Sequence, residues 1–219
     1  MKHLLILALF VFPTVCTAQA DNSDFQVWNE TSVSFPINDS KTVSALVFGN
    51  LRVTDNVSKL SDKRIGFGVE FKTKHNITIF PNYLFRVDTS SNNAKYEHRL
   101  RFDITPNFKF KKFSIENRSR FEQHLRLENR KDNTFYRNRT KANIPLKIGG
   151  ETKFGLFISN ETFFDIRNGR LYRNDIGAGF SQKVSPKLSL EYFYQYRHNF
   201  DSGTKHINVV GVNLKIKTK

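Results

Sequence analysis

Charged side chains recur at every second position in several stretches of the chain, and they are the first candidates for chemistry. Arg99, Arg101 and Asp103 alternate in this way, so an extended strand would place all three on one face. The candidate set has fourteen members, all on the nominal inner faces of predicted strands: Arg99, Arg101, Asp103, Glu116, Arg118, Arg120, Glu122, Arg137, Arg139, Glu161, Arg173, Asp175, Glu191 and Arg197. We expect these residues to line the lumen of a barrel.

Both signs of charge occur in the candidate set, and opposite charges on adjacent strands can pair with each other. We therefore expect an ion-pair network that fills a narrow lumen. The excess of arginine leaves a second interpretation open, in which the interior conducts anions or binds a ligand.

Hydrolysis would need a nucleophile, a base and an orienting group within hydrogen-bond reach of each other. His198, Asp201 and Ser202 lie close in sequence near a predicted outer loop, and His124 shares a predicted strand with Glu122. Neither group resembles the His-x-Ser motifs of outer-membrane phospholipases or lipid A deacylases. We therefore expect no catalytic residues and no enzymatic activity, and an outer-membrane lipid hydrolase is kept as an alternative.

Metal and cofactor chemistry has little support in the sequence. The histidines after the N-terminal segment are scattered, with no two spaced by two residues on one strand: His75, His98, His124, His198 and His206. The single cysteine is Cys16, and Gly149-Gly150 lies in a predicted turn instead of opening a helix. The sequence predicts no metal site and no cofactor.

Strands must position these side chains, because apolar and polar residues alternate through most of the chain. In residues 64–72 the odd positions, such as Ile65 and Phe67, are apolar, and the even ones are small or charged. Eleven segments of this kind can be recognised, each followed by a polar connection: residues 25–35, 42–53, 64–72, 77–87, 98–110, 113–126, 134–148, 154–166, 172–184, 188–200 and 206–217. This alternation is typical of an antiparallel barrel that has one face toward lipid.

Bacterial single-chain barrels have even strand numbers, because both chain ends lie on the periplasmic side. Either the first segment is not a full strand, which gives ten strands, or one long segment contains two, which gives twelve. The expected fold is an all-β, antiparallel, up-and-down transmembrane barrel of ten to twelve strands.

Tight and longer connections alternate along the chain and predict its orientation. Tight links occur at residues 74–76, 110–113, 149–151 and 185–187, and longer ones at 54–63, 88–97, 127–133, 167–170 and 201–205. Because such barrels have short periplasmic turns and long outer loops, the last strand should end on the periplasmic side.

Polar residues interrupt the expected outer face in two segments: Asn117, Ser119, Gln123, Asn138 and Thr140. These stretches could extend above a bilayer. A soluble secreted ligand-binding barrel, with its apolar face inward, would show a similar period and is the structural alternative.

The N-terminal segment predicts export. Lys2 precedes an apolar run at residues 4–15, and Ala18-Gln19-Ala20 fits a signal-peptidase site, so residues 1–20 are expected to be removed and residues 21–219 to form one domain. A lipoprotein attached through Cys16 is a weaker alternative. The formal net charge of +15 would fit nucleic-acid binding, but the basic residues are spread out and export argues against that partner.

Three short motifs are similar to a known family: Asp24-Phe25-Gln26-Val27-Trp28, Tyr136-Arg137-Asn138-Arg139 and Gly211-Val212-Asn213-Leu214. They resemble a domain-of-unknown-function family of outer-membrane β-barrel proteins, and the first motif is the most specific. The resemblance implies a barrel and assigns no activity. The chain departs from many outer-membrane barrels by lacking a C-terminal aromatic residue, since it ends in Lys219.

The function expected from these observations is that of an outer-membrane barrel, structural or a narrow passive pore with an Arg-rich lumen. Its expected partners are outer-membrane lipid, lipopolysaccharide and, during biogenesis, the barrel-assembly machinery.

Overall fold

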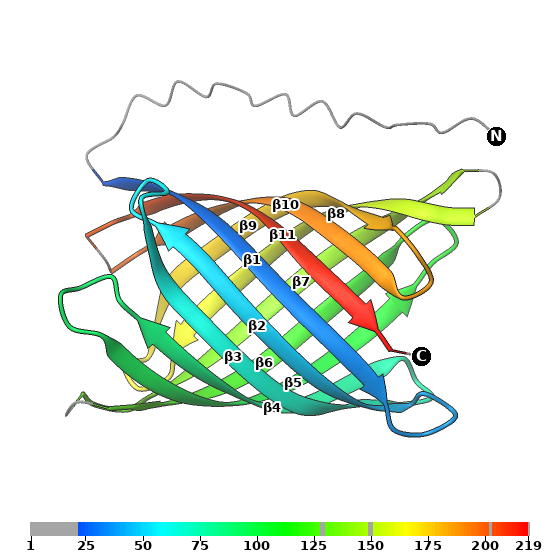
Figure 1. Ribbon diagram of the computed structural model, residues 1–219, viewed down its shortest axis with the longest axis horizontal. Helices are drawn as coiled ribbons and strands as arrows, with labels where there is room; N and C mark the ends of the chain where they lie inside the picture. Colours follow the sequence, from blue (N-terminus) through cyan, green and yellow to red (C-terminus); the bar gives the residue numbers. More distant parts are fainter. Residues whose placement is uncertain (1–21, 128–129, 149–150, 202, 219) are drawn as a thin grey trace.

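The computed structural model describes residues 22–127, 130–148, 151–201 and 203–218, and they form a closed β-barrel of eleven strands (Figure 1). The strands are β1 (Ser23–Pro36), β2 (Val43–Thr54), β3 (Lys59–Lys72), β4 (Ile77–Asp88), β5 (Lys95–Lys109), β6 (Ser114–Arg126), β7 (Asn133–Ile148), β8 (Glu151–Asp165), β9 (Arg170–Lys183), β10 (Leu188–Asn199) and β11 (His206–Lys217). The expected signal peptide with Cys16, the Gly149-Gly150 turn and Ser202 lie outside the described residues.

Each of the eleven segments expected from alternation coincides with one strand, so the prediction of an all-β barrel is confirmed. The largest difference is at β3, which begins at Lys59, five residues before the expected segment, and β5 and β8 each begin three residues early, at Lys95 and Glu151. The starts of β3 and β5 lie in stretches that the sequence assigned to long loops. Polar residues at the end of a barrel strand look like loop residues because neither face there needs to be apolar.

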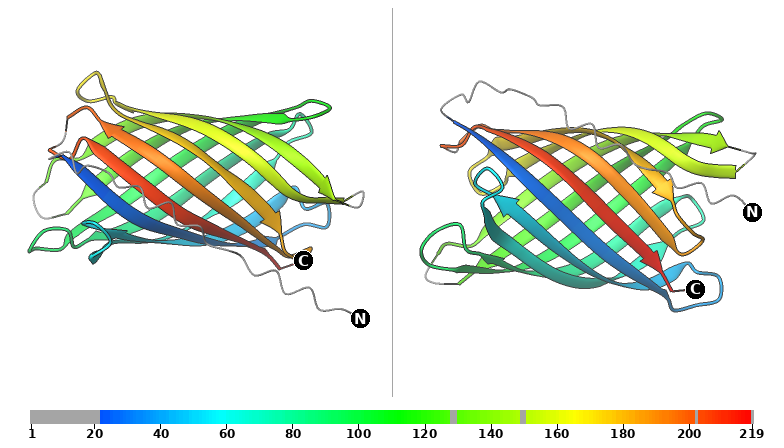
Figure 2. Two further views of the ribbon diagram at one scale, coloured as in Figure 1. Left: turned by 90° about the horizontal axis from the view of Figure 1, so that it is seen from above. Right: turned by 45° about the horizontal axis from the view of Figure 1, so that its top comes forward.

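The expected even strand number is wrong, and so is the expectation of antiparallel pairing throughout. β1 and β11 lie side by side and run in the same direction, with an unbroken register from Ser23 opposite His206 to Ser34 opposite Lys217 (Figures 1 and 2). All other neighbouring strands are antiparallel. An odd number of strands closes only through one parallel pair, because consecutive strands alternate in direction.

Side chains and tight packing support the parallel seam. The Asn29 amide Nδ2 donates a hydrogen bond to the Val212 carbonyl oxygen at 2.9 Å. Inside the barrel, Trp28 packs on Ile207 and Val209, and Phe193 of β10 lies against this cluster. Gly211 lies opposite Trp28, and a Cβ at this position would come within 2.6 Å of the Trp28 carbonyl oxygen. A glycine is therefore needed where β11 passes the Trp28 cluster.

β1 begins at one end of the barrel and β11 finishes at the other (Figure 1). We call the end where β1 and β11 begin the loop end; it carries the connections at residues 55–58, 89–94, 127–132, 166–169 and 200–205. The other is the turn end, with connections at 37–42, 73–76, 110–113, 149–150 and 184–187. The C-terminal strand finishes at the turn end, whereas β1 starts at the loop end.

The two faces of the barrel wall differ strongly in polarity. Large apolar side chains are exposed on the outside from β1 around to β10, and Ile158 in the middle of β8 is 66% exposed. Charged residues such as Asp103, Arg120 and Glu122 are buried. Pairs between strands that are not neighbours, such as Arg118 of β6 with Glu161 of β8, show that these charges meet in the lumen.

A polar patch interrupts the apolar exterior on β6 to β9. Asn117 and Asn138 exchange amide hydrogen bonds at 3.1 and 3.0 Å, and Asn117 also donates to Thr140 at 2.9 Å. On the next strands Asn160 donates to Asn174 at 3.1 Å. These polar side chains satisfy each other along the wall between adjacent strands.

No helix with the length and apolar character needed to cross a membrane occurs in the described part of the chain.

Candidate functional site: the charged lumen and its loop-end cavity

The centre of the lumen is organised around buried carboxylates. Glu122 is only 2% exposed and accepts hydrogen bonds from Arg137 at 2.8 Å and from His124 at 3.0 Å. Arg120 approaches Glu122 at 3.4 Å and binds both oxygens of Asp103 at 2.6 Å. Because each carboxylate has an arginine partner, the desolvation of these charges is compensated locally.

Glu161 of β8 pairs both with a neighbouring strand and with a strand that is not its neighbour. Its Oε1 accepts from Arg118 of β6 at 2.6 Å and from Arg137 of β7 at 2.9 Å. Next to Glu161, on β9, Asp175 forms a two-bond pair with Arg197 of β10 at 2.8 and 2.7 Å. These pairs join side chains of the strands from β6 to β10 inside the barrel.

Toward the turn end, the network thins. Lys141 reaches across the lumen to Glu191 at 2.6 Å. The Arg139 side chain lines a hollow of about 80 Å³, and its buried Nε has no hydrogen-bond partner among the described residues. Arg101 donates to Asn82 at 2.6 Å and lies over the Phe48 ring, whereas Glu116 accepts only a long bond from Asn107 at 3.4 Å.

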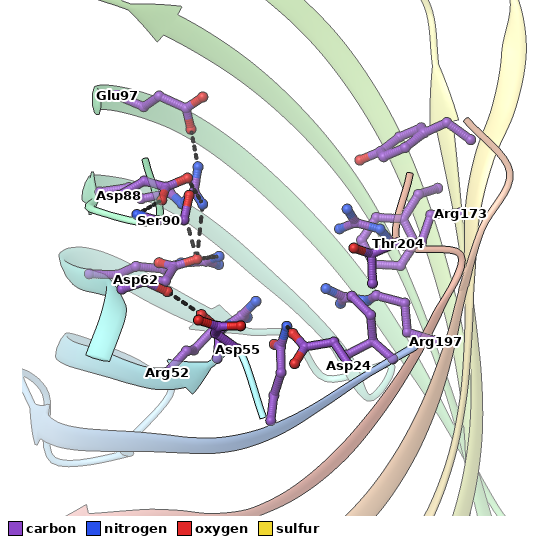
Figure 3. A pocket seen from close by; sticks show the side chains of 18 of the residues that line it. Asp24, Arg52, Asp55, Asp62, Asp88, Ser90, Glu97, Arg173, Arg197 and Thr204 are labelled. Carbon is purple, nitrogen blue, oxygen red and sulfur yellow. Dashed lines mark hydrogen bonds and ion pairs between the residues drawn. The ribbon is translucent and has the colours of Figure 1, made fainter. Parts of the chain in front are cut away.

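A cavity of about 680 Å³ opens at the loop end, above this network (Figure 3). Nine of its lining residues are cationic: Arg52, Lys59, Arg64, Arg86, Arg99, Arg126, Arg137, Arg173 and Arg197. Six carry carboxylates: Asp24, Asp55, Asp62, Asp88, Glu97 and Glu122. The wall of the cavity therefore has more positive than negative groups.

One wall of the cavity, from β3 to β5, is a chain of ion pairs. Arg64 binds Asp62 at 2.6 Å, and Arg86 contacts Asp62 at 3.1 Å and Asp88 at 2.7 Å. Glu97 continues the chain, with Arg99 as its closest partner at 2.5 Å. Positive and negative groups nearly balance on this wall.

The first sequence motif supplies two residues of β1 that line the cavity, Asp24 and Gln26. Gln26 donates to Asp24 at 2.6 Å, and the Trp28 indole Nε1 donates to Gln26 at 2.7 Å. Two guanidinium groups make cation–π contacts with the Trp28 ring, with Arg52 at 3.6 Å and Arg197 at 4.6 Å from its centroid. Alternation explains why Asp24, Gln26 and Trp28 act together, since residues two apart share one face of a strand.

Arg173 completes the opposite wall on β9. Its Nε donates to Asn199 at 2.8 Å, and its guanidinium lies 5.2 Å from the Phe163 centroid and 5.3 Å from that of Tyr172. Figure 3 shows Arg173 and Arg197 on one side of the cavity, facing Arg52 and the acidic side chains on the other. Neither Arg52 nor Arg173 forms an ion pair with a carboxylate of the described residues.

Two ion pairs separate the cavity from the hollow near the turn end. Arg137 and Arg197 line the cavity, whereas their partners Glu161 and Asp175 line the smaller hollow. The lumen is thus partitioned by salt bridges at this level.

Of the residues considered for hydrolysis, His198 and Asp201 have separate contacts, and Ser202 lies outside the described residues. His198 contacts the His206 ring and Phe200, while Asp201 pairs with Arg170 at 3.2 Å. His124 lies in the cavity wall beside Glu122. Within the described ranges, no three His, Cys, Asp or Glu side chains gather in a group that could hold a metal ion.

The structure brings most of the fourteen candidate residues into one connected interior, but only five of them line the cavity: Arg99, Glu122, Arg137, Arg173 and Arg197. Sequence reasoning missed most of the other charged lining residues. It did not identify Arg52, Asp62, Arg64 or Arg86, which belong to β2, β3 and β4. The signal was present as alternate charges at Asp62 and Arg64 and at Arg86 and Asp88. Asp62 falls in residues 54–63, which were interpreted as a loop, and Arg52, Arg64 and Arg86 lie at or next to the ends of predicted strands.

Fold and site together define a closed β-barrel protein with a buried charged network. The chain matches the family described as "Protein of unknown function (DUF2490)" over residues 25–208, and it belongs to this family. The resemblance seen in the sequence motifs is thereby confirmed at the level of a family of unknown function. Neither the curated proteins nor the solved structures contain a match.

Proposed function

We propose that this protein is an outer-membrane barrel that spans the bilayer and has a salt-bridged, non-conducting lumen open only at the loop end. The observation that carries the proposal is the inverted polarity of the wall, with apolar side chains exposed and charged ones buried. A soluble barrel would bury its apolar face instead, because the hydrophobic effect drives apolar surface out of water.

The dimensions of the barrel support the proposal. Its strands have 12 to 16 residues, and at about 3.3 Å per residue with a tilt near 40° they span about 30–40 Å along the axis. The apolar band of an outer-membrane barrel is about 25 Å tall. The strands are long enough to cross it with both ends in water.

Several sequence expectations enter this proposal unchanged. Export would follow from the N-terminal segment, and the partners would be outer-membrane lipid, lipopolysaccharide and the assembly machinery. We propose no enzymatic role, because His198 and Asp201 are engaged in separate contacts.

Lysine substitutions on the outer surface test the proposal directly. Ile158→Lys places a charge in the middle of β8, where it should cost about 2–4 kcal/mol of stability in a bilayer. Ile37→Lys is the matched control, because Ile37 is 62% exposed but lies in the 37–42 connection. The measurement is the yield of heat-modifiable, folded protein in lipid vesicles and in membrane fractions of expressing cells.

We expect Ile158→Lys to fold poorly in vesicles and Ile37→Lys to behave as wild type. Equal behaviour of the two variants, or recovery of the wild-type chain as a soluble periplasmic monomer, would overturn the proposal.

A further inference from the structure

Three guanidinium groups lie in a row along the loop-end cavity, and only the middle one is neutralised. Arg52 and Arg197 share the Trp28 ring, and Arg197 and Arg173 share the Phe163 ring. Asp175 is paired with Arg197 through two hydrogen bonds. Arg197 nevertheless repels both of its neighbours, because like charges lie close to each other in a partly buried site.

Stacking fixes Arg52 and Arg173 without using their hydrogen-bond donors. An aromatic ring contacts the flat face of a guanidinium, so the N–H groups at its edge stay available. The Nε of Arg173 donates to Asn199, so the two terminal nitrogens remain for a ligand in the cavity that Arg173 lines. Arg52 has no hydrogen bond to the described residues. Such preoriented donors are suited to an anion with several oxygens.

Size and charge of the cavity narrow the ligand class. A volume of about 680 Å³ is within the range of small-molecule sites, about 300–1,000 Å³. Nine cationic against six acidic lining residues leave a surplus of positive charge that a polyanion would balance. Arg52 and Arg173 come from opposite walls, which favours a tetrahedral group whose oxygens point in several directions over a planar carboxylate.

We propose that the loop-end cavity binds a phosphate-bearing polyanion, with Arg52 and Arg173 as the residues that hold the phosphate. The ligand is a small soluble phosphate compound or the phosphorylated headgroup of a lipid. Binding relieves the repulsion along the arginine row and uses donors that the protein leaves unpaired.

The test uses the complete mature chain in a zwitterionic detergent at low ionic strength. Three probes are titrated by calorimetry: inorganic phosphate, pyrophosphate, and micelles doped with phosphatidic acid. Trp28 is the only tryptophan of the chain, so its fluorescence reports events at the Arg52 site independently. We expect saturable binding of at least one probe, with a change in Trp28 emission and with weaker binding at high salt.

Arg52→Gln and Arg173→Gln should each weaken binding at least tenfold. Arg139→Gln is the matched control, because Arg139 is another interior arginine without a carboxylate ion pair in the described residues, and it lines the separate hollow. We expect the control to bind like wild type. Far-UV circular dichroism and heat-modifiable migration establish that each variant is folded.

Should a variant fail to fold, the wild-type chain alone decides, because a ligand that binds only the folded state must raise the unfolding temperature. Saturation by pyrophosphate indicates a soluble ligand, and saturation by phosphatidic acid alone indicates a lipid headgroup. Either result supports a cavity that binds phosphate. Absence of binding and of stabilisation with all three probes, or an equal loss in Arg139→Gln, overturns the inference. Because binding is measured in detergent, that failure would leave the membrane proposal untouched.

Discussion

Individual buried charges in this barrel each serve more than one partner. Glu122 receives Arg137, His124 and, at longer range, Arg120. A single carboxylate therefore compensates cations from two strands. Such residues are sensitive positions, because removal of one partner leaves the others buried without compensation.

Replacement of Glu122 should be far more costly than replacement of the partly exposed Glu70. We expect Glu122→Ala to lower the free energy of unfolding by about 3–5 kcal/mol. In Glu70→Ala, which removes a partly exposed pair with Lys72, the loss should be about 0–1 kcal/mol. Urea unfolding of the detergent-solubilised protein, followed by Trp28 fluorescence, gives both values. Similar losses in the two variants would show that the lumen network does not stabilise the barrel.

Residue-level prediction from the sequence was possible where a charge pattern lay inside a recognisable strand. Arg118, Arg120 and Glu122 alternate within one clear segment, so their shared face could be predicted. Trp28 could not be assigned a role, because its effect depends on Arg52 and Arg197, which are distant in the sequence. Alternation identifies the face of a strand but gives no information about what lies across a lumen.

At the scale of strands, the parallel pairing of β1 and β11 is the unusual element. The alternation of residues 25–35 and 206–217 predicted both strands, and both exist. The pairing of these two strands with each other is a long-range property of the closed sheet. The expected strand number was even because it was based on known bacterial barrels. Only the spatial neighbours of β1 reveal that its partner runs in the same direction.

Cysteine pairs can test the parallel register, since the mature chain is expected to lack cysteine. Val27 lies opposite Val210 in the seam, so Val27→Cys with Val210→Cys should form a disulfide on mild oxidation. Val27→Cys with Leu214→Cys is the control, because Leu214 is four register positions further along β11.

The readout is the migration of heat-denatured protein on non-reducing gels, where a disulfide closes a large loop and makes the chain run faster. We expect this shift for the Val210 pair alone. Crosslinking of the Leu214 pair with equal efficiency would contradict the observed register.

For the molecule as a whole, the partition of the lumen by salt bridges supports the proposed non-conducting interior. The Arg137–Glu161 and Arg197–Asp175 pairs lie between the loop-end cavity and the turn-end hollow. Barrels of about eight strands are packed solid and wide channels occur at about sixteen, so eleven strands fit a largely filled interior.

Planar-bilayer recordings of the purified protein should therefore show no stable, large conductance. In a salt gradient, any rare openings should be small, and their reversal potential should show no strong preference for anions. Stable anion-selective openings that decrease in Arg118→Ala and Arg137→Ala would show instead that these arginines line an open water path.

If the barrel spans the outer membrane as proposed, its odd number of strands places the beginning of β1 and the end of β11 in different compartments. If the turn end faces the periplasm, Ser23 at the start of β1 emerges toward the medium while Lys217 at the end of β11 stays inside. An epitope fused ahead of Ser23 would be displayed on intact cells, whereas one fused after the C-terminus would be reached by antibody only after permeabilisation. A circular permutant of this barrel would need a linker that runs the full height of the wall, so the natural ends cannot be joined by a short peptide.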